Sequence, residues 1–345
     1  MSAPLDRSDL WQAAEIVAAR TDLHAFMGIA TPDYVDGWCV RDVCANLHHF
    51  SAQVAARKSP RVLISLPPRT GKTLHCCERF PAWHLGQHPT HRAIVASYSL
   101  SLARDATRAA REVAQSLAYR AIFPKVQLAA DTRAKADWRT RDNGGMKAVG
   151  VGGALTGFGA DILVIDDPHK NAREALSQQR RDDVWAWYQA VARTRVQPGG
   201  GILGIMTRWH EDDLIGRLRK AQAAGDDFAE QWEVVDFPAL SEAGEALWPE
   251  RYNVHRLHQT RQAVGPYKWS CLYQQRPTRL ESSRAYRRYT DAHKDDSVDY
   301  DPRLPLQISF DFNTNPGMYS EVGQYDLVKD QLTTVEEVCG DGMDL

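Results

Sequence analysis

The stretch from Ser65 to Thr73 carries residue types that bind a triphosphate. It reads Ser-Leu-Pro-Pro-Arg-Thr-Gly-Lys-Thr, follows the strand-like run 61–64, and precedes a segment that can continue as a helix. Backbone N–H groups of such a turn and of the helix N-terminus point at an anion, and the helix dipole also favours negative charge there. The spacing therefore predicts that Lys72 reaches the β- and γ-phosphates of a nucleotide, with the Thr73 hydroxyl on Mg²⁺.

This loop differs from the pattern G-x4-G-K-[ST] at its first position, where Leu66 stands in place of glycine. Pro67 and Pro68 stiffen the turn instead. An ordinary strand-to-helix turn with an exposed lysine is the alternative that the loop alone leaves open. The residues predicted to bind nucleotide here are Pro68, Arg69, Thr70, Gly71, Lys72 and Thr73.

A second motif lies farther along the chain, where the aliphatic run 162–165 ends in two adjacent carboxylates. The run predicts a buried central strand whose tip carries Asp166 and Asp167. Asp166 can hold Mg²⁺, because this ion prefers one or two carboxylates together with phosphate oxygens. Asp167 can orient or deprotonate the attacking water, so it is the predicted catalytic carboxylate. Alone, the motif could be a strand and an acidic turn; together with the upstream loop it predicts an ATPase.

A third candidate lies at the end of another buried-type run, 201–206. In P-loop motors, the strand next to the one that carries the paired acids ends in a polar residue that senses the γ-phosphate. Thr207 or Arg208 fits that role, and we predict Thr207 as a catalytic residue. The acids that follow at 211–213 are predicted to cap a helix.

The region before the first strand, residues 1–57, is predicted to be mostly helical because its apolar residues recur at helical spacing. In many P-loop motors the corresponding region holds the adenine ring. Trp38 and Arg41 could stack on that ring and are therefore predicted nucleotide-binding residues. A core tryptophan and a surface arginine are the alternative interpretation.

The elements that must position these residues alternate between strand and helix, which predicts a parallel α/β sheet. The glycine-rich stretch 150–161 leads into a strand and opens no helix, which excludes a dinucleotide-binding Rossmann interpretation. The further predicted elements are a helix at about 72–86, a strand at 92–98, a helix at about 101–117, short antiparallel strands within 124–150 and a charged helix at 172–195.

The composition of the 345-residue chain is that of a soluble globular protein, with 43% hydrophobic and 25% charged residues. Its length allows one large domain or two ordinary ones. The formal net charge of −2 gives no global basicity, although a local patch could still bind DNA. Six cysteines without C-x-x-C spacing predict reduced thiols and neither a disulfide framework nor a zinc site. No apolar run reaches transmembrane length, and no signal peptide is visible.

In combination these motifs resemble the large subunit of tailed-bacteriophage terminases, the motors that package DNA into procapsids. The match keeps the order of the family's motifs over about residues 60–278. One departure is Phe158, where the resemblance implies an arginine. The stretches that carry the resemblance are 66–73, 150–153 with Thr156 and Gly157, 165–168, 207–214, 247–251 and 272–277.

The resemblance implies an α/β P-loop ATPase that uses ATP and Mg²⁺ and works as a homo-oligomeric ring on the procapsid. It implies double-stranded DNA, the portal protein and the terminase small subunit as partners, and no membrane. The implied localisation is the bacterial host cytoplasm, transiently at the procapsid portal. Arg69 matches an arginine that the family places near the phosphates, which implies a catalytic role in stabilising transition-state charge.

The C-terminal part is predicted to form a separate unit. A charge-rich, apolar-poor stretch precedes it, as expected of an interdomain linker. The strand-like runs beyond it resemble the start of a ribonuclease-H-like nuclease domain. There Asp311 would be the first carboxylate of a two-metal site for Mg²⁺ or Mn²⁺. The resulting scheme is a helical region at 1–57, a P-loop ATPase core at 58–280, a linker at 281–304 and a partial nuclease domain at 305–345.

Two other functions remain open from the sequence. A helicase-like remodelling ATPase would share both phosphate-site motifs, but it does not explain Trp209-His210 or the segment 273–275. A catalytically impaired prophage remnant or assembly component would bind nucleotide or procapsid without turnover, and Phe158 favours it. A nuclease site needs further carboxylates and a complete sheet, so we expect that this 345-residue chain does not cut DNA.

Overall fold

The computed structural model describes residues 7–129, 137–153, 157–225, 230–277, 306–311, 318–326 and 331–340. Two compact units divide the chain, Met1–Arg279 and Leu280–Leu345. Each unit is described by itself below. The predicted linker at 281–304 lies outside the described residues.

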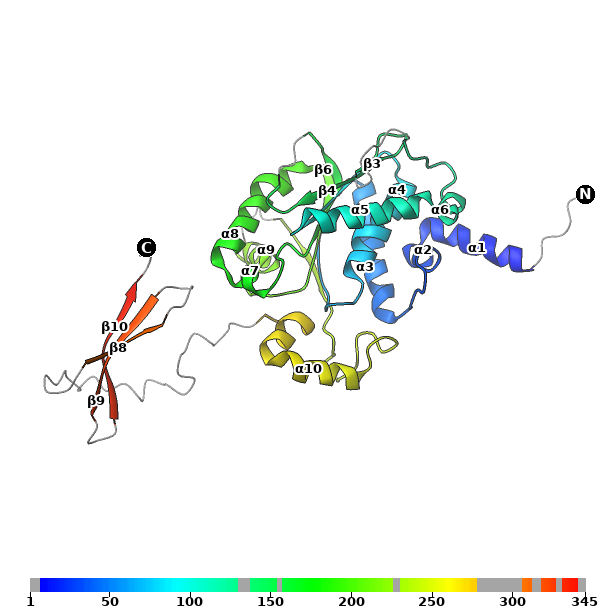
Figure 1. The fold of residues 1–345 in the computed structure, drawn as a ribbon. Helices are drawn as coiled ribbons and strands as arrows, with labels where there is room; N and C mark the ends of the chain where they lie inside the picture. The colour runs from blue at the N-terminus through cyan, green and yellow to red at the C-terminus, as the bar shows by residue number, and fades with distance from the viewer. Residues whose placement is uncertain are drawn as a thin grey trace, which may run out of the picture. The chain divides into compact units, whose positions relative to one another are not determined.

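The first unit is built on a mostly parallel seven-stranded sheet with the strand order β3-β4-β2-β5-β6-β1-β7 (Figure 1). Its neighbouring strands pair in parallel, except that β3 runs antiparallel to β4. The predicted parallel α/β sheet is therefore confirmed. The strands are β1 Arg61–Ser65, β2 Arg92–Ser97, β3 Trp138–Arg139, β4 Gly145–Gly150, β5 Ala160–Asp166, β6 Val196–Met206 and β7 Glu233–Asp236.

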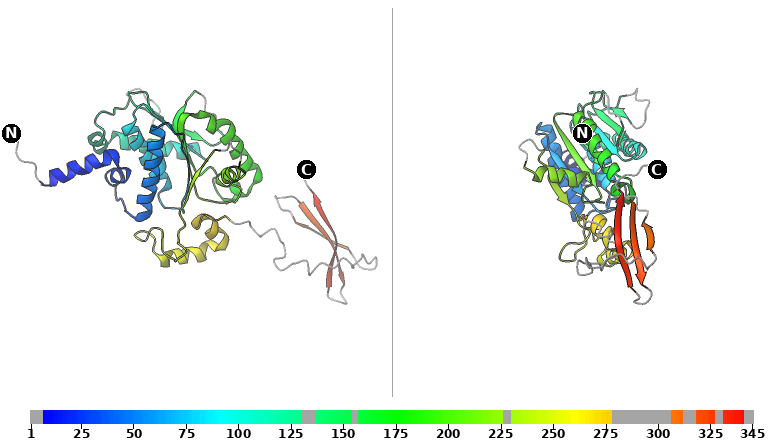
Figure 2. Two further views of the ribbon diagram at one scale, coloured as in Figure 1. Left: turned by 180° about the vertical axis from the view of Figure 1, so that it is seen from behind. Right: turned by 90° about the vertical axis from the view of Figure 1, so that its left-hand side faces the viewer.

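Helices cover both faces of this sheet (Figures 1 and 2). Ile162 and Val164 of β5 face the larger core, which includes residues of α1–α6, whereas Leu163 and Ile165 face a second core that includes residues of α8 and α9. This alternation follows from the two-residue side-chain period of a strand. The helices are α1 Arg7–Thr21, α2 Leu23–Ala30, α3 Trp38–Ala55, α4 Phe80–Gln87, α5 Leu100–Gln115, α6 Leu117–Ile122, α7 Ala172–Leu176, α8 Gln178–Trp187, α9 Leu214–Ala223 and α10 Val254–Lys268.

Two predicted helices differ from those in the structure. The helix expected at about 72–86 starts as a π-helix, η1 (Leu74–Arg79), and continues as α4. The charged helix expected at 172–195 is divided into α7, α8, the π-helix η2 (Tyr188–Ala192) and the 3₁₀-helix η3 (Arg193–Arg195). The first division has a local cause, because Ser177 is extended and its side chain caps α8 by accepting from the Arg180 N–H.

A third, smaller core lies in the segment that follows β7. It is formed by Ala239, Leu240, Ala246, Leu257 and Trp269, and it includes residues of α10 and of the π-helix η4 (Trp269–Tyr273). The backbone N–H of Phe237 donates to the Ser65 carbonyl at 2.9 Å, which ties the start of this segment to the end of β1. The aromatic residues of this segment are thereby brought next to the loop that follows β1.

The second unit contains an antiparallel three-stranded sheet with the order β10-β9-β8. Its strands are β8 Leu306–Asp311, β9 Met318–Asp326 and β10 Gln331–Gly340. The three consecutive strands therefore form an antiparallel meander, and a register shift lies between Thr334 and Glu336 in β10. Across both units, none of the helices in the described ranges is long and apolar enough to cross a membrane.

Candidate nucleotide-binding site

The predicted site residues come together because three parallel strands end at one edge of the sheet. Ser65, the last residue of β1, pairs with Met206, the last residue of β6. On the other side of β6, Asp166 at the end of β5 pairs with Ile205. In open parallel sheets, ligands bind beyond the carboxyl ends of the strands. The loop after β1 and the acids after β5 therefore meet at the place where a ligand is expected.

Lys72 lies buried in the loop, and its ammonium group has three acceptors. Nζ donates to the carbonyl oxygens of Leu66 at 3.3 Å and Pro67 at 3.1 Å, and to Oγ1 of Thr207 at 2.7 Å. The first two contacts fold the lysine back over its own loop, and the third links it to the end of β6. Phosphate oxygens of a bound nucleotide could replace these three oxygen atoms as acceptors of the Lys72 ammonium group.

Thr73 and Asp166 form the oxygen-rich side of the site. Thr73 Oγ1 donates to Oδ2 of Asp166 at 2.8 Å. The other carboxylate oxygen, Oδ1, is buried and has no hydrogen-bond partner among the described residues. A hydroxyl beside a carboxylate with a spare buried oxygen is the kind of ligand set that Mg²⁺ accepts when phosphate oxygens and water complete its shell. The residues present therefore fit a nucleotide-bound Mg²⁺.

Burial makes the two acids weaker than usual. The pKa of Asp166 is raised to about 6, first by burial and then by the charge of Asp167, while the Thr73 hydrogen bond and Lys72 oppose the shift. The pKa of Asp167 is also raised by burial, and Lys72 and the Thr207 amide counteract it. Two adjacent buried carboxylates with one lysine nearby favour an additional cation at this position.

Asp167 has an orientation that the backbone around it fixes. Its φ is +40°, in the left-handed region that residues other than glycine seldom adopt. Its backbone N–H donates to Ile205 O at 2.9 Å, and its Oδ1 accepts from the backbone N–H of Thr207 at 2.8 Å. Such strained positions persist where the surroundings hold them, and they cluster at functional sites.

Thr207 is the residue through which the two motifs meet. It is buried, its hydroxyl contacts Lys72, and its amide holds Asp167. Arg208, the other candidate for the sensor role, is engaged elsewhere. Its Nε donates to Asp213 at 3.1 and 2.9 Å in a fully buried pair. The geometry therefore favours Thr207.

One of the acids after β6 caps a helix. Asp213 accepts from the backbone N–H of Gly216 at 2.9 Å and caps α9, which begins at Leu214. The capping prediction is therefore confirmed for Asp213, whereas Asp212 forms ion pairs with Arg181 and Arg217.

The remaining loop residues set the shape of the turn. Gly71 has φ +80°, and a Cβ there would lie 2.7 Å from the His75 ring, so both conformation and space require glycine. Thr70 closes the turn by donating from Oγ1 to Pro67 O at 2.7 Å. Arg69 is exposed with φ +64°, and its carbonyl accepts from the Tyr252 hydroxyl at 3.2 Å.

Trp38 and Arg41 lie at the start of α3. The Trp38 side chain is half exposed, and the Arg41 guanidinium forms an ion pair with Asp36 at 2.8 Å. Neither residue lines the cavity that adjoins the loop. Their role in adenine binding stays a prediction that this geometry does not strengthen.

Two other positions singled out in the sequence are Phe158 in the first unit and Asp311 in the second. Phe158 precedes β5, whereas Asp166 ends it, so the two are separated by the length of a seven-residue strand, roughly 20 Å. Arg92 and Lys147 each lie 5.6 Å from the centre of its ring. Asp311 is the last residue of β8 in the second unit, where its backbone pairs with Tyr319.

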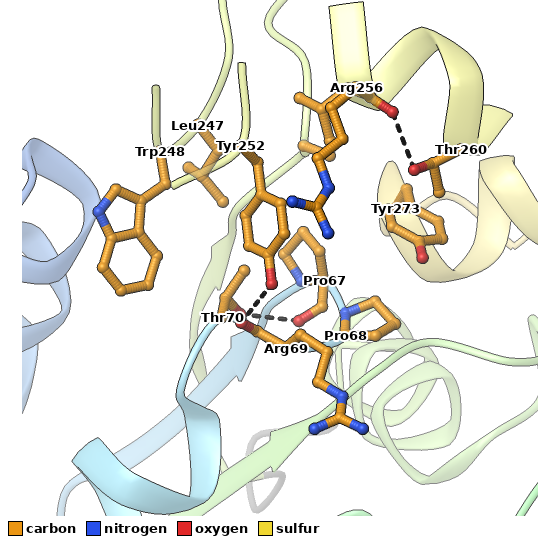
Figure 3. Close-up of a pocket in the computed structure, with 12 residues that line it drawn as sticks. Pro67, Pro68, Arg69, Thr70, Leu247, Trp248, Tyr252, Arg256, Thr260 and Tyr273 are labelled. Carbon is orange, nitrogen blue, oxygen red and sulfur yellow. Dashed lines mark hydrogen bonds between the residues drawn. The ribbon is translucent and has the colours of Figure 1, made fainter. Parts of the chain in front are cut away.

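A cavity beside the loop includes residues for which the sequence motifs assigned no chemistry. It has a volume of about 190 Å³, and the loop stretch Pro67–Thr70 forms one wall (Figure 3). Aromatic side chains form much of the rest. Part of the sequence signal was present, since 247–251 contains Trp248 and 272–277 contains Tyr273, but nothing local shows that these side chains reach the loop. The lining residues beyond the loop are Ala239, Leu247, Trp248, Tyr252, Arg256, Leu257, Thr260 and Tyr273.

The parallel sheet, the phosphate-binding loop and the paired acids define a P-loop nucleotide-binding domain. Residues 63–295 match the family model described as terminase large subunit, T4likevirus-type, N-terminal. The chain therefore belongs to the terminase large subunit family. No curated protein matches the sequence.

Solved structures with a similar fold are also large terminases. The HK97 bacteriophage large terminase shares 11% identity over 93% of this chain and 66% of its own, with a TM-score of 0.48. A mutant ATPase domain of the Thermus phage P74-26 large terminase shares 12% identity over 67% of this chain and 96% of its own, with a TM-score of 0.39. The large terminase of the thermophilic bacteriophage D6E in complex with ADP shares 11% identity over 85% of this chain and 68% of its own, with a TM-score of 0.38. The chain thus spans 66% of the length of the HK97 protein.

Proposed function

We propose that this chain is an ATP-driven motor of viral DNA packaging, which hydrolyses ATP and moves double-stranded DNA into procapsids. The observation that carries the proposal is the hydrogen-bonded connection of the loop to both neighbouring strand ends: Lys72 to Thr207, and Thr73 to Asp166. Family membership supports a packaging role for this proposed ATPase site. The D6E large terminase in complex with ADP supports a nucleotide as the ligand.

In the proposed mechanism, Thr73 and Asp166 hold Mg²⁺, which would neutralise charge on the β- and γ-phosphates when bound. Lys72 exchanges its two loop carbonyls and the Thr207 hydroxyl for phosphate oxygens. That exchange frees the Thr207 hydroxyl to contact the γ-phosphate. Asp167 orients the attacking water, and the Thr207 amide keeps its carboxylate in place.

Arg69 is proposed to stabilise charge on the transferred phosphoryl group. Within the described residues its guanidinium has no ion-pair partner, while its carbonyl is held by Tyr252. Figure 3 shows this side chain directed away from the aromatic cavity. Arginines in this role accelerate phosphoryl transfer by roughly 10³–10⁵-fold.

The proposed assembly is a homo-oligomeric ring on the procapsid, acting with the portal protein and the terminase small subunit in the bacterial host cytoplasm. These partners follow from family membership. The proposed arrangement along the chain keeps an ATPase core at 58–280, a linker at 281–304 and the start of a ribonuclease-H-like nuclease domain at 305–345. Asp311, at the end of β8, is proposed as a metal ligand of that domain.

The first experiment measures steady-state ATP hydrolysis with Mg²⁺, with and without linear duplex DNA, for wild type, Lys72→Ala and Asp167→Ala. We expect turnover in the wild type, loss in both variants, and stimulation by DNA or by portal-bearing procapsids. Binding of ATP without hydrolysis, even with procapsids, would instead support the remnant or assembly function. Strand separation coupled to turnover would support a helicase-like ATPase.

The nuclease proposal needs its own assay. Metal-dependent nicking of plasmid DNA is compared between wild type and Asp311→Ala. Nicking that disappears in the variant would assign the metal site to Asp311.

A further inference from the structure

The backbone that follows β6 is held by side chains. The strand ends at Met206, and each of the next three backbone N–H groups donates to a side-chain oxygen. The pairs are Thr207 with Oδ1 of Asp167 at 2.8 Å, Arg208 with Oε1 of Gln275 at 3.4 Å, and Trp209 with Oδ2 of Asp213 at 3.4 Å. The two aspartates have roles described above, whereas Gln275 has none in the chemistry proposed so far.

Gln275 is a buried residue, and the two ends of its amide group have separate partners. Its side chain belongs to a residue that is 2% exposed. Nε2 donates to the carbonyl of Leu272 at 2.8 Å, and this contact fixes the orientation of the amide, because a carbonyl can only accept. Oε1 is therefore the end that faces the Arg208 N–H. Removal of the amide would leave two buried backbone groups without these partners.

The backbone conformation at Gln275 is one that glycine usually adopts. Its φ is +56°, and it directly follows Gln274, the residue that ends the helix η4. Helices often end in a left-handed residue, and glycine takes that conformation at no steric cost. A glutamine at this position carries some strain and places an amide group beside the end of β6.

The segment that carries Gln275 makes a second contact with the same backbone. The Tyr267 hydroxyl donates to the carbonyl of Trp209 at 3.0 Å. The segment is closed on itself, since the Arg276 N–H donates to the Ser270 carbonyl at 2.9 Å and the Ser270 hydroxyl donates to the Arg276 carbonyl at 2.6 Å. A closed segment thus holds two consecutive residues that directly follow the proposed sensor residue.

The contact with Gln275 bears on Thr207 through one peptide group. The Arg208 N–H belongs to the planar group that joins it to Thr207, so its hydrogen bond limits how the Thr207 side chain can turn. The Thr207 hydroxyl in turn accepts from Lys72 at 2.7 Å. At 3.4 Å the Gln275 contact is longer than the usual N–H···O distance of about 2.9–3.0 Å, and hydrogen bonds of catalytic sites often shorten when substrate binds.

We propose that Gln275 is a positioning residue for hydrolysis. Through the Arg208 amide it holds the Thr207 hydroxyl where the γ-phosphate of the nucleotide would lie. This inference rests on the proposed ATPase function and deepens it. Gln275 acts through Thr207 and not by contact with the nucleotide, and this role gives the segment 273–275 a part in the reaction.

The first test measures steady-state hydrolysis of ATP by the full chain with two variants. Gln275→Met removes both polar ends at similar length, and Gln275→Asn keeps an amide and suits the left-handed backbone but is one methylene too short. We expect each to lower kcat roughly tenfold and to change the KM for ATP less than about twofold, because Lys72 and Thr73 still bind the phosphates. Gln259→Met, on the exposed face of α10, is the matched control and should behave as the wild type.

An unchanged kcat in a folded Gln275 variant, or a loss that appears in KM alone, would overturn the proposal. Gln275→Asn decides the matter if Gln275→Met does not fold.

The second test is a double-mutant cycle that a merely structural role would fail. Gln275→Met is combined with Thr207→Val, which lacks the hydroxyl that Gln275 is proposed to position. We expect Gln275→Met to lower kcat by less than about twofold in this background, although it lowers kcat roughly tenfold in the wild type. An equal fold-loss in both backgrounds would show that Gln275 does not act through Thr207.

Failure of this inference can be told apart from failure of the ATPase itself. Hydrolysis that Lys72→Ala abolishes and that the Gln275 variants leave unchanged removes only the positioning role. Absence of hydrolysis, or hydrolysis that persists in Lys72→Ala, removes both proposals. Hydrogen–deuterium exchange of the nucleotide-free protein tests the contact directly: we expect exchange within residues 207–209 to be roughly tenfold faster in Gln275→Met, and unchanged exchange would count against the contact.

Discussion

Thr207 joins the loop after β1 to Asp167, the proposed catalytic carboxylate, through two different atoms. Its hydroxyl accepts from Lys72 at 2.7 Å, and its amide donates to Asp167 at 2.8 Å. A substitution at the side chain removes the first contact and keeps the second. The hydroxyl can therefore be tested without disturbing the acid.

We expect Thr207→Val to lower kcat for ATP by roughly 10²-fold, the size of effect that follows removal of one preorganised polar contact to the reacting group. The KM for ATP should change much less, because Lys72, Thr73 and the loop amides still bind the phosphates. Thr207→Ser, which restores a hydroxyl, should recover most of the rate. Steady-state kinetics decides the matter, and a Thr207→Val enzyme with unchanged kcat would remove the sensor role.

Individual residues differ in how well the sequence predicted them. Lys72 and Asp166 belong to short motifs whose chemistry depends on neighbours in the chain, so each could be predicted from its own motif, whereas the pairing of β1, β6 and β5 brings the two motifs together. The choice between Thr207 and Arg208 could not be made in this way, because it depends on whether Asp213 lies close enough to pair with the arginine. Tyr273 lies in one of the family motifs, but no role could be predicted for it. Its position beside the loop depends on how a segment distant in sequence packs.

The junction between β6 and α9 is held by a buried ion pair. Arg208 and Asp213 have side chains that are 4% and 0% exposed, and Asp213 also accepts from the backbone N–H groups of Trp209 and Gly216. Because Arg208 follows Thr207 directly, this pair also fixes the end of β6 that carries Thr207.

We expect Asp213→Ala to lower the free energy of unfolding by about 3–5 kcal/mol, since it leaves a guanidinium buried without its partner. Arg219→Ala is the matched control, because it breaks the half-exposed pair with Asp236 and should cost less than about 1 kcal/mol. Urea unfolding measures both. Equal, small losses in the two variants would show that the junction does not depend on the buried pair.

The order of the strands and helices along the chain could be predicted from the sequence, whereas the exact form of two helical segments could not. Alternating buried strands and helices around two motifs indicated a parallel sheet, which the structure contains. The π-helical start of the segment after the loop, Leu74–Arg79, has no signature that sequence periodicity can detect. The division of 172–195 depended on one serine, Ser177, whose capping role competes with continuation of the helix.

The whole molecule consists of two units that differ in what they contain. The first, Met1–Arg279, has its own sheet with cores on both faces and holds every predicted residue of the nucleotide site. The described part of the second is a three-stranded antiparallel sheet. The strands of that sheet were predicted from local patterns, whereas its assignment to a nuclease rested on resemblance and remains a proposal.

We expect a fragment of residues 1–279 to fold by itself and to bind ATP with Mg²⁺ as tightly as the full chain, within about threefold. All contacts of Lys72, Thr73 and Tyr252 described above lie inside this unit, and its cores supply the apolar burial that folding requires. Calorimetric titration of both proteins provides the measurement. Binding lost in the fragment, despite a cooperative thermal transition, would mean that the second unit contributes to the site.

The three acceptors of Lys72 have a consequence for release of the nucleotide that we propose as its ligand. With Leu66, Pro67 and Thr207 as partners, the ammonium group is fully hydrogen-bonded before any phosphate arrives. Release of the proposed nucleotide therefore leaves no buried ammonium group without hydrogen-bond partners. An unpaired buried charge would otherwise oppose release. If the proposed nucleotide binds here, the empty loop therefore carries little electrostatic cost, and release of product would not be slowed by an unpaired lysine.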